Sequence, residues 1–438
     1  MGNFVQEITS MFEDHDDFFI KEMIVDNTAI FLMGFHTLID LTKSNLYVRQ
    51  MAESSTSVND LFINISNQLD VDAKQIIKAV LEGKLVILSG NSNRNAVVEP
   101  VSRNLSRSIE EPKNENPILA SMNAFGEDLT TNVGIIRKRL NTELLCHCSY
   151  QVGELNKRKL SMLYIRGRAP SSLIEKVHLQ LQQIKSDIET IDDLNKHLGQ
   201  RKSNLVSHLF PTEIPIQAVH SLKKNRVVLF LDNYPFALVF PHLLWDMFSS
   251  ANDRNFPFVL ALMLRILRVI GALVTIILPA LYVATVSVNP EVLKLDFALF
   301  VAESREGIPL TALLATITMV VIIDLILEAI VRLPKSVGPT VTMVGGVILG
   351  QAMVEAKLVS NLLVIVITAI VIASSTLIGV QNSLYVRLLK YPVLFLSSVY
   401  GILGLFTGLT FIGIYLSSLT SNGIPYTTFR IEEKGGTK

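Results

Sequence analysis

Apolar residues follow two different patterns along this 438-residue chain. In residues 1–255 they form short runs between polar and turn-forming residues, which is typical of a globular region that mixes helices and strands. After residue 256 they form long runs, and a helix of about 20 apolar residues is long enough to cross a bilayer. The pattern therefore predicts an α+β chain: a two-lobed α/β soluble region followed by a polytopic bundle of membrane helices.

Five apolar segments of the second region are candidate membrane spans. The clearest is Val269–Val288, in which twenty consecutive positions carry no charge. The others are Leu310–Val331, Val337–Val354, Leu358–Val380 and Leu394–Leu416. We expect five crossings, or four if one segment is re-entrant.

Basic residues beside these segments predict the orientation of the chain. Three pairs border the segments: Arg265 with Arg268, Arg332 with Lys335, and Arg387 with Lys390. Cytoplasmic loops are enriched in Lys and Arg, so all three pairs lie inside if the N-terminal region is inside and the chain crosses five times. That topology leaves the tail beyond residue 429, which contains three basic residues, outside. A re-entrant segment would return the tail to the inside.

Short apolar runs and helical periodicity predict the elements of the first 255 residues. Strands are expected at Ala29–Phe35, Leu85–Leu88, Leu160–Ile165, Val227–Leu231 and Ala237–Phe240. Helices are expected at Val71–Leu81, Ala124–Arg139 and Ser172–Ile184. A capping box is expected at the start of the last helix, with Ser172 as N-cap and Glu175 three residues later.

The same succession of segments occurs twice in this region. Ile30–Gly34 resembles Leu163–Gly167, and Leu85–Gly90 resembles Val227–Asp232. Self-similarity of this kind predicts two related lobes from an internal duplication. We place the first lobe with its linker in residues 1–110, the second lobe in 111–255 and the membrane bundle in 256–438. Ser102–Pro117, rich in Ser, Asn, Glu and Pro, is the expected connection.

Composition and charge remove several classes of function. Residues 1–255 contain 27 Lys and Arg and 30 Asp and Glu, which leaves 12 and 9 of the chain's 39 and 39 for the rest. A formal net charge of zero provides no bulk basic field for nucleic acid. Walker, GxGxxG, HExxH and GxSxG motifs are absent from the sequence. We therefore expect no enzyme, no cofactor, no metal and no nucleic-acid partner.

Two short clusters in the soluble region are interpreted as structural. Cys146 and Cys148 flank His147, but this spacing belongs to an ordinary strand rather than to a zinc knuckle. With only two Cys in the chain, a disulfide scaffold is excluded as well. Arg137-Lys138-Arg139 at a predicted helix end is typical of a solvated turn that compensates the helix dipole.

Two carboxylates interrupt the second apolar segment. Asp324 and Glu328 are four residues apart and so lie on one helix face. Acidic side chains inside a span are costly and often form ion sites or proton relays. Alternatively they lie near the inner boundary, where Arg332 is placed to pair with Glu328.

Four polar residues recur every seven positions along the fourth apolar segment: Asn361, Thr368, Ser375 and Asn382. Seven residues nearly complete two helical turns, so these side chains are expected to line one face. An uncharged polar face suits the wall of a water-filled cation path. Hydrogen bonding between helices uses the same residue types and is the alternative.

Small residues four apart predict close packing of helices. The pairs are Gly346 with Gly350, Ser397 with Gly401, and Gly404 with Gly408. Such spacing lets helix backbones approach closely and supports a compact bundle or an oligomer.

Taken in order, several of these segments resemble the A subunit of the bacterial spore germinant receptors. The similarity runs from about Leu81 to Phe429. The matching motifs are Arg107–Pro112, Phe125–Asn132, Ile135–Leu140, Leu278–Ala284, Ala302–Pro309, Val331–Pro334, Ser418–Ser421 and Gly423–Tyr426. The chain departs from the family pattern at Leu119–Ala124, at Gln351 and in its first 25 residues.

The resemblance implies a function in spore germination. Such A subunits lie in the spore inner membrane with a transporter-like B subunit and a lipoprotein C subunit. They are expected to form a homo-oligomer, a pentamer, around a nutrient-gated cation channel. Asn361, Thr368 and Ser375 would then face the pore. Three charged residues of the external loop would shape its mouth: Glu303, Arg305 and Glu306.

Two alternatives remain beside the channel. The chain could be a non-conducting scaffold that couples receptor clusters, with the polar stripe buried between its own helices. It could also be a paralogue that amplifies germination downstream of the receptor. In each case the N-terminal region is expected on the cytoplasmic, spore-core side of the membrane.

Overall fold

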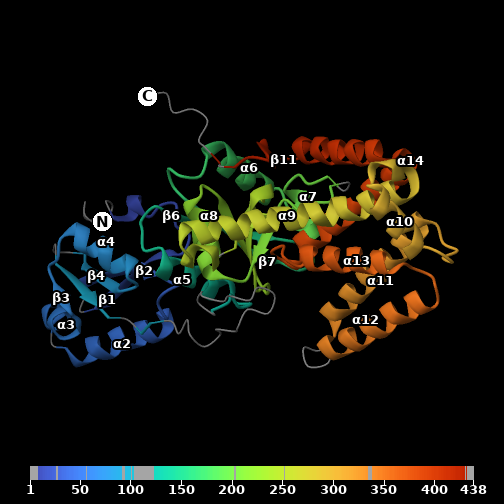
Figure 1. The fold of residues 1–438 in the computed structure, drawn as a ribbon. Helices are drawn as coiled ribbons and strands as arrows, with labels where there is room; N and C mark the ends of the chain where they lie inside the picture. The colour runs from blue at the N-terminus through green and yellow to red at the C-terminus, as the bar shows by residue number, and fades with distance from the viewer. Residues whose placement is uncertain are drawn as a thin grey trace. The chain divides into compact units, whose positions relative to one another are not determined.

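The chain folds into two compact units, named here the α/β unit and the helical unit (Figure 1). They are seen in a computed structural model. It describes residues 8–25, 28–55, 57–90, 94–99, 101–102, 123–201, 204–250, 252–333, 338–429 and 431. The α/β unit comprises Met1–His242, Ser421–Ile424 and Thr428–Lys438, and the helical unit comprises Leu243–Thr420 and Pro425–Thr427. The predicted order, an α/β region followed by a helical region, is confirmed.

The first lobe of the α/β unit is a five-stranded antiparallel sheet with helices. Its strands lie in the order β1 (Phe18–Val25), β2 (Thr28–Phe35), β4 (Leu85–Ser89), β5 (Asn95–Val98) and β3 (Gln68–Leu69). Its helices are α2 (Leu41–Ser54), α3 (Val58–Ile65) and α4 (Ala73–Leu81). Apolar side chains of β2, β4, β5 and all three helices form one core cluster.

The second lobe repeats this plan. Its strands lie in the order β6 (Leu145–Val152), β7 (Arg158–Ile165), β9 (Val227–Leu231), β10 (Ala237–Phe240) and β8 (Phe210–Thr212). Its helices are α5 (Leu129–Arg139), α6 (Ser171–Gln182), α7 (Ile191–His197) and α8 (Pro215–Lys223). Every residue of β9 is buried, because alternate side chains enter two separate cores on the two faces of the sheet. Helices α5 and α8 contribute to one core, and α6 and α7 to the other.

The two lobes share one topology, which confirms the prediction from the sequence repeats. In each lobe two paired strands are followed by two helices, a short edge strand, a helix and a final strand pair. The strand order in space is also the same. Strands predicted at Val227–Leu231 and Ala237–Phe240 have those exact bounds. The predicted capping box at Ser172 is wrong, because α6 begins after Pro170 and has no side-chain cap. The capping box of this lobe is at Thr190 and Asp193, at the start of α7.

Helix α5 begins five residues later than predicted, because Asp128 is its N-cap. The Asp128 carboxylate accepts a hydrogen bond from the Thr131 amide at 3.0 Å. The side chain of Asn132 accepts from Gly126 N at 3.0 Å and donates to Gly126 O at 2.7 Å. The segment before the helix is thus held to its first turn, with Phe125 in the core.

A buried ion pair joins the two lobes. Asp17, which precedes β1, is fully buried, and Arg137 of α5 is 3% exposed. Arg137 donates Nε and Nη2 to the two carboxylate oxygens of Asp17, both at 2.5 Å. Its guanidinium also lies 3.9 Å from the centre of the Phe35 ring. The solvated turn predicted for Arg137 is therefore wrong, whereas Lys138 and Arg139 are exposed as expected.

Two histidines complete this interlobe cluster. His15 Nδ1 lies 3.0 Å from Arg137 Nη2, and His147 Nδ1 lies 3.5 Å from Asp17 Oδ1. Nearby, Asp16 N donates to His147 O at 3.0 Å, and His147 N donates to Asp14 O at 3.2 Å. His147 is thus part of an ordinary strand, β6, as expected from the spacing of its neighbouring cysteines.

The helical unit is built of long apolar helices. They are α9 (Phe258–Val283), α10 (Leu295–Ser304), α11 (Ala312–Arg332), α12 (Gly338–Glu355), α13 (Asn361–Ser374) and α14 (Val380–Ser418). Short elements are η1 (Leu244–Phe248), η2 (Asn252–Asn255), a π-helical turn η3 (Ala284–Val288) that extends α9, η4 (Pro290–Val292), β11 (Thr420–Ser421) and β12 (Ile424–Pro425). Among the described residues, three helical stretches are long and apolar enough to cross a membrane: Phe258–Val288, Ala312–Ile330 and Val380–Ser418.

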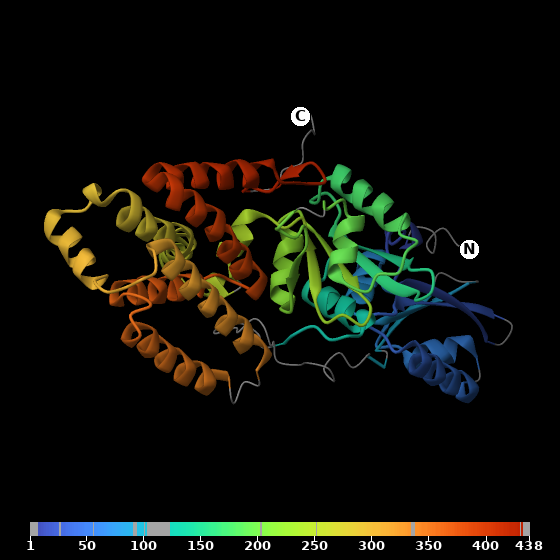
Figure 2. The same cartoon turned by 90° about the vertical axis from the view of Figure 1, so that its right-hand side faces the viewer.

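Helix α14 reverses direction at Gly401, so the fifth predicted span is wrong. Gly401 has φ 60° and ψ −135°, a conformation outside the helical region. Gly404 lies against the backbone of Leu396, and Gly408 lies against Val393. Residues eight and fifteen apart would be about 12 and 22 Å apart in a straight helix. Figure 2 accordingly shows the red C-terminal helix as two segments joined at a sharp bend. Gly404 and Gly408 do serve close packing, as their spacing predicted.

This reversal returns the C-terminal end of the helical unit to the side where α9 begins. Leu244 N donates to Tyr426 O at 3.0 Å, and Trp245 Nε1 donates to Thr427 O at 3.2 Å. The five-crossing topology with an external tail is therefore wrong, and the re-entrant alternative accounts for the contacts. The three basic residues of the tail lie outside the described residues.

The fourth predicted span is shorter than expected. Helix α13 has 14 residues and ends at Ser374, and the chain turns through Gly379 before α14 begins. Three other expectations fall outside the described residues: most of the Ser102–Pro117 connection, the Arg107–Pro112 motif, and Lys335.

Candidate functional site

Asp324 lies in the middle of α11 and is the centre of a charge cluster with α14. Its carboxylate receives hydrogen bonds from Lys390 Nζ at 3.1 Å and from Tyr391 Oη at 2.6 Å. Lys390 is 2% exposed. Arg387 Nη1 lies 3.5 Å from Asp324 Oδ1 and forms an ion pair there. Asp324 thus connects two helices through charge-assisted hydrogen bonds, which are the strong kind.

Glu328, one turn further along α11, behaves as the alternative interpretation predicted. Its carboxylate pairs with Arg332 Nη2 at 2.7 Å, and both side chains are largely exposed. An exposed pair of this kind contributes little to stability. The two carboxylates therefore differ, since Asp324 joins α11 to α14 and Glu328 pairs within its own helix.

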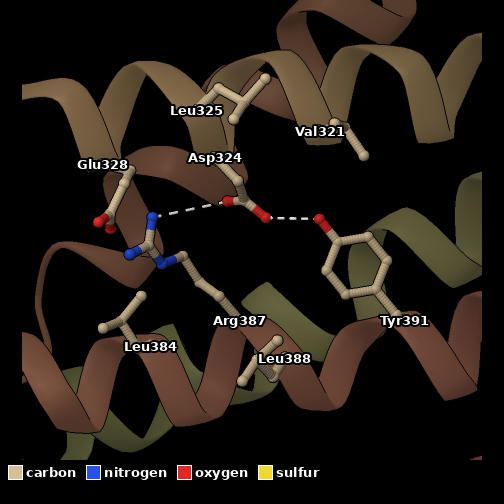
Figure 3. A pocket seen from close by; sticks show the side chains of 8 residues that line it. All are labelled: Val321, Asp324, Leu325, Glu328, Leu384, Arg387, Leu388 and Tyr391. Atoms are coloured by element: carbon tan, nitrogen blue, oxygen red, sulfur yellow. Dashed lines mark hydrogen bonds and ion pairs between the residues drawn. The ribbon is translucent and has the colours of Figure 1, made fainter.

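A cavity of about 250 Å³ lies between α11 and α14 beside this cluster. Figure 3 shows Arg387 reaching across it from α14 toward Asp324 and Glu328 on α11. The other lining residues are Val321, Leu325, Leu384, Leu388 and Tyr391. The cavity therefore has charged groups on one part of its wall and apolar side chains on the rest.

Arg387 and Lys390 were predicted to follow a span in an inside loop, and this is wrong. Both lie within α14, and both are buried. The sequence did contain a signal, because positions 387, 390 and 391 are spaced i, i+3 and i+4 and share one helix face. Matched with Asp324 and Glu328 on α11, that spacing could have suggested a pair of facing charged helices.

Only three of the four residues in the predicted polar stripe are exposed. Asn361, Thr368 and Ser375 are exposed on α13 and at its end. Thr368 and Ser375 donate their hydroxyls to the carbonyls of Val364 and Val371, both at 2.8 Å. Asn382 is buried on α14 and donates to Ile378 O at 2.9 Å. The helix break at residues 375–379 removes Asn382 from the stripe, so three positions remain.

The segment after α10, which was predicted to be an external loop, is connected to the start of α13. Arg305 donates to Leu310 O at 2.9 Å and to Tyr282 Oη at 3.5 Å. The Tyr282 hydroxyl lies 3.2 Å from Ser360 Oγ, and Ser360 is the N-cap of α13. Arg305 is thus partly buried and held by hydrogen bonds.

Glu303 and Glu306 differ from Arg305, because both are exposed.

Within the described ranges, no group of three or more His, Cys, Asp or Glu is placed to hold a metal ion. Burial, followed by the charge of Asp16, raises the pKa of the Cys148 thiol to about 11. That thiol is therefore a poor nucleophile at neutral pH.

Comparison with known proteins identifies the family. Residues 6–435 match the family described as Bacillus/Clostridium GerA spore germination protein. The chain belongs to the GerA family.

The GerA relatives cover most of the chain. The spore germination protein GerLA of Bacillus cereus is 31% identical over 357 residues, which is 81% of this chain and 72% of GerLA. The spore germination protein A1 of Bacillus subtilis strain 168 is 28% identical over 93% of this chain and 85% of its own length. The uncharacterized membrane protein YfkQ of the same strain is 29% identical over 86% of this chain and 74% of its own length.

A solved structure also aligns with this GerA protein. It is the N-terminal domain of the A subunit of the Bacillus megaterium spore germinant receptor GerK3. The alignment has a TM-score of 0.40 at 15% identity and covers 55% of this chain and 94% of that domain.

The charge cluster of this GerA protein gives a first prediction. Asp324→Asn is expected to lower the free energy of unfolding by about 2 kcal/mol, because Lys390 loses a charge-assisted hydrogen bond in a buried position. Thermal unfolding of the full chain in detergent measures the change. Glu328→Gln, at the exposed pair, is expected to change it by less than about 0.5 kcal/mol. Equal effects of the two variants would contradict a structural role for the Asp324 cluster.

Proposed function

We propose that this GerA protein is the A subunit of a spore nutrient germinant receptor. Several copies would assemble around an axis lined by α13 and form a nutrient-gated cation channel. A transporter-like B subunit would bind the nutrient, and a lipoprotein C subunit would complete the receptor. The chain would lie in the spore inner membrane, with the α/β unit on the core side. The proposed assembly is a pentamer.

The observation that carries this proposal is the exposed polar face of α13. Asn361, Thr368 and Ser375 leave a single copy with uncharged polar groups on its surface, on a helix whose other residues are Leu, Ile, Val and Ala apart from the buried Ser374. Copies related by a rotation axis would bring identical faces together at that axis. Hydroxyl and amide groups on such a wall favour a hydrated cation path.

The length of α13 also supports a position beside water. Its 14 residues extend about 21 Å, which is shorter than the hydrocarbon core of about 30 Å. Irregular backbone at either end of a short helix needs hydrogen-bond partners, and lipid offers none. A helix of this length therefore suits a segment that borders an aqueous cavity within an oligomer.

The contacts of Arg305 supply a route by which a partner could open the channel. A nutrient-bound partner that contacts the exposed Glu303 and Glu306 would displace the neighbouring Arg305. Arg305 is connected through Tyr282 to Ser360, which caps α13. The nutrient would open the channel only to the extent that its complex binds the open state more tightly.

Potassium release from spores tests the channel. Spores that lack this gene would be complemented with the wild type, Thr368→Phe or Leu403→Phe. We expect Thr368→Phe to abolish the release that follows nutrient addition within minutes and precedes dipicolinate release, because a bulky apolar group narrows the path. Leu403→Phe is the matched control, since Leu403 is an exposed apolar residue of α14.

The outcome separates the channel from its alternatives. Protein level and oligomer size must be unchanged in the Thr368→Phe strain, so that a loss of flux reflects the path itself. Normal early release with this variant would reject α13 as the pore wall. Intact early release without the gene, followed by slower later steps, would favour a scaffold or an amplifying paralogue instead.

A further inference from the structure

Arg387 is a buried cation without a full hydrogen-bonding partner. It is 9% exposed, and its Nε and Nη1 atoms make no hydrogen bond. Its 3.5 Å ion pair with Asp324 falls short of hydrogen-bonding geometry, because Lys390 and Tyr391 already occupy that carboxylate. A buried polar group that lacks hydrogen bonds is costly and calls for an explanation.

The charges around Arg387 leave one positive charge in excess. The cluster contains Arg332, Arg387 and Lys390 against Asp324 and Glu328. Lys390 neutralises Asp324 at 2.9 Å, and Arg332 neutralises Glu328 at 2.7 Å. Each carboxylate thus has its own cation, and Arg387 is the group left over. An anion beside Arg387 would remove the excess.

The cavity next to Arg387 has the form of a site for an amphiphile. Its volume is about 250 Å³, and Arg387 reaches into it, as Figure 3 shows. Val321, Leu325 and Leu388 border the cavity and are 40%, 64% and 49% exposed. A charged group at Arg387 would therefore be followed by apolar surface on both helices.

One end of the cavity lies near the end of α11 that carries Arg332. Arg332 is the last residue of α11, and Asp324 lies eight residues, or about 12 Å, before it. Basic residues at helix ends lie at the membrane interface. Glu328 lies four residues, or about 6 Å, before Arg332, so the cavity begins near the boundary between head groups and hydrocarbon and extends from there into the hydrocarbon as far as Val321.

We propose that this cavity binds the phosphate of an anionic membrane lipid through Arg387. The phosphate would accept from the guanidinium of Arg387, and an acyl chain would lie along Leu325 and Leu388. A guanidinium is well suited to phosphate, as it is planar and weakly hydrated. The bound lipid would then connect α11 and α14 beside the Asp324 bridge. The site would stabilise the membrane region whether or not the chain conducts ions.

The test measures thermal stabilisation of the detergent-purified full chain by added phosphatidylglycerol, phosphatidylcholine or inorganic phosphate. Phosphatidylglycerol is expected to raise the unfolding midpoint more than phosphatidylcholine does. Arg387→Gln should weaken phosphatidylglycerol binding about tenfold to a hundredfold, the range of a lost charge-assisted hydrogen bond. Arg387→Lys should retain part of it. Arg332→Gln, at the exposed neighbouring pair, is the charge-matched control and should retain most of the binding.

A second variant keeps the test decisive if Arg387→Gln does not fold. Leu388→Trp fills the mouth of the cavity and leaves every charge in place, and it should abolish lipid stabilisation. Stabilisation by inorganic phosphate that equals that of the lipid and survives Leu388→Trp would overturn the lipid and leave a free-anion site. Equal stabilisation by both lipids, or no effect of any cavity variant, would overturn the proposal entirely.

Discussion

Replacing Asp17 with alanine is expected to lower the free energy of unfolding of the α/β unit by about 3–5 kcal/mol, the effect of breaking a buried ion pair. Asp17 is fully buried, and each of its two carboxylate oxygens accepts one hydrogen bond from the guanidinium of Arg137. It also accepts from Thr37 Oγ1 at 2.8 Å. Without the carboxylate, the guanidinium of Arg137 would remain in the interior with no anion.

Hydrogen exchange of backbone amides in the full chain measures the loss of stability beside the Asp17–Arg137 pair. Amides of β1 and β6 lie on the two sides of the interlobe cluster, so their protection reports its opening free energy. The double variant Asp17→Ala with Arg137→Met is the control, since removing both charges restores much of the lost stability. Exchange in β6 that is unchanged in Asp17→Ala would show that the pair does not hold the lobes together.

The destabilisation caused by Asp17→Ala should become smaller in acid. Burial alone would raise the pKa of Asp17, but the charge of Arg137 and the neighbouring His147 outweigh it and hold the pKa well below its usual value of 3.8. A group whose pKa is lowered by folding contributes stability above its unfolded pKa and loses it as the pH falls. The difference between wild type and Asp17→Ala should therefore shrink below about pH 4.

His15 adds to this acid sensitivity at higher pH. Burial, and then the charge of Arg137, lowers the pKa of His15 from 6.5 to about 4. The unfolded chain consequently binds a proton on this residue between these two values, while the folded chain does not. Folding stability should fall as the pH decreases from about 6.5 toward 4, before Asp17 itself is protonated.

Local pattern predicted the α/β unit well, because its strands are buried and its turns are marked. The runs at 227–231 and 237–240 are apolar at every position and have turn residues on each side, which fixes both ends. The repeated segments predicted the duplicated topology for the same reason. The linkage of Asp17 to Arg137 was beyond reach, since 120 residues separate them and no periodicity connects them.

The helical unit was harder to predict, because apolar runs give length but not direction. Residues 394–416 form an adequate span by hydropathy, although the chain turns back at Gly401. Arg387 and Lys390 were assigned to a loop because charge is disfavoured within a span, and here the Asp324 carboxylate compensates for that cost. The polar face of α13 was recognised from spacing alone, and its break before Asn382 depends on the turn at Gly379.

The reversal at Gly401 gives the last prediction. Gly401→Ala is expected to prevent assembly of the helical unit. A side chain at φ 60° and ψ −135° costs about 1–3 kcal/mol in backbone strain. A Cβ atom there would also clash with Asn289 Oδ1, which accepts a hydrogen bond from Ile402 N at 3.0 Å. The substitution therefore opposes both the turn and the cap of the segment that follows it.

Membrane yield and accessibility of the C-terminus measure the outcome. Gly401→Ala should give little monodisperse protein after detergent extraction, and a cysteine placed at Thr427 should no longer be labelled from the side where α9 begins. Gly413→Ala is the matched control on the same helix, since no atom lies within 4 Å of its Cβ position. Adding Asn289→Ala to Gly401→Ala would relieve the clash and leave the backbone strain, so partial recovery separates the two causes. Normal yield and labelling in Gly401→Ala would mean that α14 does not depend on this turn.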